Sequence, residues 1–136
     1  MSRPVLTPEQ KIAKRKKSQY LNFVKNTIRR ASYRWPPRGE AEKAARVARG
    51  LYKCAHCENT FKRSEVELDH IEPVVPIKES WIMENGDPDW NLYIKRCFPD
   101  VDGYQMLCKT CHSAKTTNED TMRAFYNAQR KEDDEK

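Results

Sequence analysis

Two pairs of cysteines, each spaced Cys-x-x-Cys, place the strongest constraint on how this 136-residue chain can fold. Cys54 and Cys57 form the first pair, and Cys108 and Cys111 form the second. A turn of this kind directs two sulfurs to one side, and two such turns facing each other complete a tetrahedral thiolate site for zinc. Four protein ligands leave no position open for water, so the predicted zinc is structural and not catalytic.

The composition explains why the chain would need such a metal. Only 38% of the residues are hydrophobic and 34% are charged, so the predicted core is small for the length. Domains with thin cores commonly recruit metals or disulfides. The N-terminal segment lacks the apolar stretch of a secretory signal, so we expect a cytoplasmic location, where cysteines serve as thiols or metal ligands. We expect the fifth cysteine, Cys97, to be a small buried apolar residue.

The charges are distributed unevenly along the chain. Residues 1–50 hold 14 lysines and arginines against three glutamates, whereas residues 51–136 hold 12 against 17 acidic residues. The first part is therefore suited to a polyanion such as DNA, although lysines and arginines can also merely solvate a helix. No run of about 18 apolar residues is present, so we expect no membrane partner.

The pattern of caps and apolar residues predicts several helices and strands. Thr7 to Gln10 has the signature of a capping box with proline at the first helical position, and it predicts a basic amphipathic helix over 8–32. Prolines 36 and 37 should break this helix. The other predicted elements are a helix over 40–49 closed by Gly50, strands over 65–71 and 104–108, a short helix over 88–97, and a last helix capped by Thr116 or Thr117.

The stretch "DHIEPVV" places Asp69 and His70 side by side at the end of a predicted strand. Neighbours on a strand point to opposite faces, so the two side chains should have different roles. Asp69 offers the hard oxygen that Mg²⁺ or Mn²⁺ prefers, and His70 can act as a base near its working pKa. If zinc joins the cysteine pairs, this strand comes close to His112, whose backbone is fixed by Cys111.

Taken together, "YKCAHC", "VELDHIEPVV" and "MLCKTCHSAKT" resemble the zinc-containing HNH endonucleases, especially the small bacteriophage-encoded members. The resemblance covers residues 51–117. It implies an α+β fold class with a zinc-stapled ββα-metal core, in which a two-stranded hairpin and a helix hold one divalent cation. We therefore predict a basic helical extension over 1–50, an HNH nuclease domain with a C-terminal helix over 51–130, and a disordered charged tail over 131–136.

The resemblance also implies a role for each site residue. His70 would be the general base that activates water, and Asp69 and His112 would hold the catalytic Mg²⁺ or Mn²⁺. The implied reaction is hydrolysis of DNA to 5′-phosphate and 3′-hydroxyl ends. The chain departs from the family at its middle asparagine: Gly103 stands at that spacing, and Asn91 matches only by order, so the group that supports the base is left open.

A different class of function fits some of the same residues. A catalytically silent zinc module could bind DNA or a protein, and the missing asparagine favours it, whereas the presence of Asp69, His70 and His112 favours the nuclease. A phage packaging or replication protein is a candidate partner by family analogy alone. Lys115 is either a phosphate contact or an ordinary solvated lysine.

Overall fold

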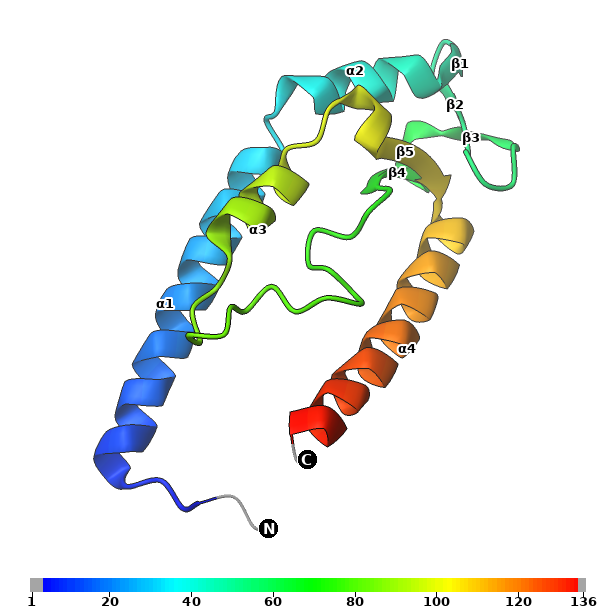
Figure 1. Cartoon of the computed structure of the whole chain (residues 1–136). Helices are drawn as coiled ribbons and strands as arrows, with labels where there is room; N and C mark the ends of the chain where they lie inside the picture. Colours follow the sequence, from blue (N-terminus) through cyan, green and yellow to red (C-terminus); the bar gives the residue numbers. More distant parts are fainter. Residues whose placement is uncertain (1–3, 135–136) are drawn as a thin grey trace. The chain divides into compact units, whose positions relative to one another are not determined.

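The computed structural model describes residues 4–134, a mixed α/β structure with four α-helices and two small sheets in that range (Figure 1). The chain forms two compact units, Met1–Arg34 and Trp35–Lys136. The first unit contains α1 (Pro8–Ser32). The elements of the second unit are α2 (Pro36–Ala45), β1 (Arg46–Ala48), β2 (Leu51–Lys53), β3 (Thr60–Lys62), the short 3-10 helix η1 (Arg63–Glu65), β4 (Val66–His70), α3 (Trp90–Cys97), the 3-10 helix η2 (Val101–Gly103), β5 (Tyr104–Cys108) and α4 (Lys109–Asp134).

Helix α1 confirms the predicted helix over 8–32. The Thr7 hydroxyl accepts a hydrogen bond from the Gln10 backbone N–H at 3.1 Å, and the Gln10 side chain accepts one from the Thr7 N–H at 2.9 Å. Both halves of the capping box are therefore present, which satisfies two N–H groups that a helix start leaves without partners. Eight lysines and arginines lie along α1, against the single acidic residue Glu9.

The second predicted helix is wrong at both ends. Pro36 and Pro37 begin α2 instead of preceding it, because the first helical positions need no N–H donor. Helix α2 ends at Ala45, and β1 follows at once and pairs antiparallel with β2. Gly50, with φ of +71°, lies in the turn between these two strands and does not cap a helix. Since α2 and β1 belong to the second unit, the predicted extension over 1–50 spans two units.

Strands β4 and β5 confirm the predicted strands and form an antiparallel pair, with Val66 opposite Cys108 and His70 opposite Tyr104. Val66, Leu68 and His70 are buried on one face, and the residues between them lie on the other. Val66 and Leu68 pack with residues of β5 and with α2 in a small core made of Ala41, Val66, Leu68, Tyr104 and Met106. The strand pair lies between α2 and the start of α4 (Figure 1).

The last helix begins earlier than predicted. Helix α4 starts at Lys109, between the cysteines of the second pair, and not at a cap formed by Thr116 or Thr117. Cys111, His112 and Lys115 therefore all lie in its first two turns. The helix continues to Asp134, into the predicted disordered tail, whose residues 135 and 136 lie outside the described residues. No helix within residues 4–134 has the length and apolar character needed to cross a membrane.

Gly103 ends η2 where two segments of the second unit approach closely. A Cβ atom at this position would lie 2.5 Å from the Cβ of Pro99, which is closer than packed atoms allow. An asparagine, the residue that the family has at this spacing, would meet the same clash. The backbone arrangement at Gly103 therefore accepts only glycine without movement.

Gly103→Ala is expected to lower the free energy of unfolding by roughly 1–3 kcal/mol, the usual cost of overpacking. Gly39→Ala is the matched control, because a Cβ at Gly39 would meet no atom within 4 Å. Since Gly39 lies inside α2, its replacement should be neutral or stabilising by up to about 1 kcal/mol. Urea denaturation of both variants measures the difference, and equal effects would contradict the close contact at Gly103.

Candidate metal centre and active site

The four predicted zinc ligands form one cluster. Their four Sγ atoms all lie within 4.8 Å of one another; the residues are Cys54, Cys57, Cys108 and Cys111. The first pair occupies the turn between β2 and β3, and the second joins the end of β5 to the start of α4. A hydrogen bond of 2.7 Å from the Ala55 N–H to the Met106 carbonyl also ties the first turn to β5. The cluster fits a metal such as zinc, as predicted.

The pKa values of two of these thiols are shifted in opposite directions. Burial raises the pKa of Cys54, but hydrogen bonds from backbone groups of Cys108, Cys57 and His56 outweigh it and lower this pKa to about 6. The hydrogen bond to Cys108, together with burial, raises the pKa of Cys111 to about 12. The Cys54 thiol therefore loses its proton more readily than the Cys111 thiol. A cation bound at the cluster would favour the thiolate form of all four cysteines.

Asp69 and His112 form the second candidate cation site. Asp69 lies on the face of β4 that α4 covers, and its Oδ1 is 3.6 Å from Nε2 of His112 in the first turn of α4. Both side chains are partly buried, with exposed fractions of 16% for Asp69 and 32% for His112, so water can still reach them. A carboxylate oxygen and an imidazole nitrogen fit Mg²⁺ or Mn²⁺, which commonly take few protein ligands and complete their shells with water.

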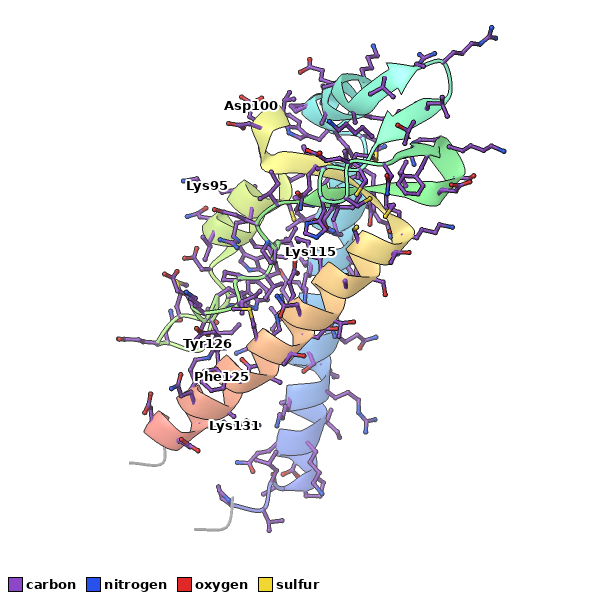
Figure 2. All side chains as sticks on the ribbon, turned by 90° about the vertical axis from the view of Figure 1, so that its right-hand side faces the viewer. Lys95, Asp100, Lys115, Phe125, Tyr126 and Lys131 are labelled. Carbon is purple, nitrogen blue, oxygen red and sulfur yellow. The ribbon has the colours of Figure 1, made fainter. Side chains whose placement is uncertain are left out.

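Lys115 lies in the second turn of α4 (Figure 2). It holds the Asp69 carboxylate in place. Its Nζ lies 2.9 Å from Oδ2 of Asp69, pairs with Glu119, and donates to the His70 carbonyl at 3.2 Å. Burial lowers the pKa of Lys115, but the pairs with Glu119 and Asp69 outweigh it and raise this pKa, so the amine stays charged. Lys115 is therefore held by two carboxylates and is not an ordinary solvated lysine; its contact with phosphate stays a prediction.

The two oxygens of Asp69 have different neighbours. Gln105 on β5, directly opposite Asp69, donates to Oδ2 at 3.3 Å, so Oδ2 is held by both Gln105 and Lys115. Oδ1 is the oxygen that faces His112. Three carboxylates lie at the site: those of Asp69 and Glu119 pair with the ammonium of Lys115, and that of Glu67 lies against His112. This excess of negative charge favours a divalent cation at the site.

His70 occupies a different position. Its side chain is buried on the opposite face of β4, and its Nε2 lies 3.2 Å from the backbone carbonyl of Cys97 at the end of α3. The ring centroid is 4.9 Å from that of Tyr104. The structure thus brings Asp69 and His112 together, while the buried His70 ring lies on the opposite face of β4. Cys97 is buried, as predicted, and its carbonyl contacts the His70 ring. Asn91, which matched the family's asparagine only by order, is exposed on α3.

The chain shares sequence with a protein of Lactococcus phage SK1 named "Probable HNH endonuclease". The two are 36% identical over 64 residues, 47% of this chain and 53% of the relative. The chain resembles a phage HNH endonuclease. It spans about half the length of that curated relative, and neither a protein-family model nor a solved structure matches it. The resemblance predicted from the motifs is thereby confirmed.

One contact of His112 was not predicted. Oε2 of Glu67 lies 3.2 Å from Nδ1 of His112, on the other edge of the ring from Asp69. The signal was present in the sequence, because residues two apart on a strand share a face and Glu67 precedes Asp69 by two positions. The Cys97 carbonyl had no comparable signal, since it reaches His70 across 27 residues through the docking of α3.

Proposed function

We propose that the chain is a metal-dependent HNH endonuclease that hydrolyses DNA phosphodiester bonds. The observation that carries this proposal is the meeting of Asp69 from β4 with His112 from α4, beside the four-cysteine cluster. Two antiparallel strands followed at once by a helix that bears the second ligand support a ββα-metal core. The similarity to a protein named an HNH endonuclease supports a nuclease role in general.

Asp69 and His112 would hold Mg²⁺ or Mn²⁺, with Lys115 and Gln105 keeping the Asp69 carboxylate oriented. The cation, when bound, would stabilise the negative charge that develops on the scissile phosphate and on the leaving 3′-oxygen. The products would be 5′-phosphate and 3′-hydroxyl ends.

His70 would take the proton of the attacking water. A backbone carbonyl can only accept a hydrogen bond, so the contact with Cys97 requires the proton of the neutral His70 ring to sit on Nε2. Nδ1 then carries the lone pair that a general base needs.

A catalytically silent zinc module is the second candidate function. The observation that favours it is the burial of His70, which is only 5% exposed and lies on the opposite face of β4 from Asp69. A base in this position works only if DNA binding uncovers the ring. A module that merely binds DNA needs no such movement, and the predicted packaging or replication partner would suit it equally well.

A plasmid-nicking assay distinguishes the two functions. Zinc-loaded protein is incubated with supercoiled plasmid in the presence of Mg²⁺, of Mn²⁺, or of neither, beside the His70→Ala variant. We expect relaxed or linear DNA only with an added cation and only from the unmodified protein. Absence of cleavage under every condition supports the silent module, and equal cleavage by His70→Ala removes His70 from the mechanism.

Helix α1 is expected to supply much of the affinity for DNA. The helix carries eight basic residues and one acidic residue, so it should bind a polyanion mainly through its positive charge. The affinity for DNA should therefore fall steeply as the salt concentration rises. Deleting residues 1–32 should remove most of the affinity and flatten the salt dependence, while the buried core clusters, all in the second unit, remain intact. Fluorescence anisotropy with a short duplex at several salt concentrations measures both quantities.

A charge variant refines this test without shortening the chain. Replacing Lys14, Arg15, Lys16 and Lys17 by glutamine keeps good helix formers in α1 and removes four positive charges. Lys131→Gln on α4 is the control for an ordinary surface lysine. If the quadruple variant and the deletion both bind with the salt dependence of the full chain, the lysines and arginines only solvate α1.

A further inference from the structure

The His112 ring lies between two carboxylates. Its Nδ1 is 3.2 Å from Oε2 of Glu67, and its Nε2 is 3.6 Å from Oδ1 of Asp69. Glu67 and Asp69 point to the same face of β4, and His112 in the first turn of α4 lies over them. The shorter distance is within hydrogen-bonding range, whereas the longer one is not.

The shorter distance makes Glu67 the carboxylate to which a neutral His112 ring would donate. An ionised carboxylate only accepts hydrogen bonds, so a hydrogen bond to Glu67 would place the proton on Nδ1. Nε2 of the neutral ring then carries the lone pair, and it is the nitrogen that faces Asp69. An imidazole binds a metal through such a lone pair, and the hydrogen bond of its other nitrogen fixes both the tautomer and the ring orientation.

We propose that Glu67 is a positioning residue that holds His112 as the Nδ1–H tautomer, so that Nε2 and Asp69 together accept a divalent cation. The inference rests on the proposed function, in which His112 is a metal ligand. Glu67 acts through the imidazole and is not itself a ligand, because its carboxylate contacts the edge of the ring opposite Nε2.

The position of Glu67 makes it suitable for substitution. Its side chain is 52% exposed, so replacing it removes no part of the buried core. Exposed ion pairs of this kind contribute little to stability, and the variants should therefore fold and keep their zinc. Glu67→Leu removes the acceptor, Glu67→Gln keeps one amide oxygen that can still accept from Nδ1–H, and Glu65→Gln makes the same change at an exposed glutamate in η1.

Nitrogen-15 NMR of the His112 ring reports the tautomer without any measurement of activity. Zinc-loaded protein free of Mg²⁺ and Mn²⁺ is examined at a pH at which the nitrogen-15 signals themselves show that the His112 ring is neutral. We expect the Nδ1–H form in the unmodified protein and in Glu65→Gln, a largely retained Nδ1–H form in Glu67→Gln, and a shift toward Nε2–H in Glu67→Leu. An Nε2–H ring in the unmodified protein, or an unchanged tautomer in Glu67→Leu, overturns the proposal.

Binding of Mn²⁺, followed by its electron paramagnetic resonance signal, supplies the second readout. Loss of a group that orients a metal-binding histidine typically costs about 10–100-fold in affinity, which we expect for Glu67→Leu but not for Glu65→Gln. Equal losses in Glu67→Gln and Glu67→Leu would make Glu67 a direct ligand and overturn the positioning role. If the unmodified protein binds no Mn²⁺, the proposed nuclease site fails, while the NMR result still decides whether Glu67 sets the tautomer.

Discussion

Removing the metal from the four-cysteine cluster is expected to unfold the second unit. The buried residues there form two small groups, and one of them, Cys54, Leu107 and Cys108, consists mainly of cysteines of the cluster that fits zinc. Binding of a structural zinc contributes about 10–16 kcal/mol at neutral pH, as much as the whole stability of a typical domain, about 5–15 kcal/mol. A strong chelator should therefore abolish most of the cooperative thermal transition, which circular dichroism measures.

A pair of cysteine variants tests the same prediction at the level of single residues. Cys108→Ser removes one ligand of the cluster, whereas Cys97→Ser changes an equally buried cysteine outside it. We expect elemental analysis to find close to one zinc per chain in the unmodified protein and in Cys97→Ser, and far less in Cys108→Ser. A protein purified without zinc that melts at the same temperature as the zinc-loaded form would contradict a structural metal.

The features that could be predicted from the sequence are those that local spacing determines. The capping box at Thr7 fixed the start of α1, and alternation fixed strand β4. The cysteine pairs determined a long-range contact as well, because a shared metal must bring the turn at Cys54 to the end of β5. His112 follows a metal ligand directly, so its approach to Asp69 was predictable for the same reason.

The features that could not be predicted depend on partners distant in sequence. Residues 46–48 lie in a stretch with helical composition but form β1, because Arg46 and Ala48 pair with Tyr52 and Leu51 of β2. Helix α4 begins at Lys109, directly after Cys108, and the Cys111 backbone N–H in its first turn donates to Cys108 Sγ instead of to a threonine cap. The contact of His70 with the Cys97 carbonyl depends on where α3 docks, which no spacing rule specifies.

Substitutions at Asp69, His70 and His112 are expected to produce two different kinds of defect. His70→Ala should leave the binding of divalent cations and DNA nearly intact and lower turnover by about 10²–10⁴-fold, the usual loss for a general base. Asp69→Ala and His112→Ala should instead weaken cation binding, so that a higher concentration of Mg²⁺ or Mn²⁺ partly restores cleavage. The geometric reason is that Asp69 faces His112 while the His70 ring lies across the strand.

Cleavage measured across a range of cation concentrations separates these defects, and zinc content and melting temperature show whether each variant is folded. All three variants should retain zinc, because the four cysteines are unchanged. His70→Gln is a second variant that fills more of the buried site than alanine, so a loss shared by both reflects the base and not a cavity. Rescue of His70→Ala by added cation, without rescue of Asp69→Ala, would reverse the two roles. Full activity of both His70 variants would show that another group takes the proton, because the ring that the Cys97 carbonyl holds in place would then be dispensable.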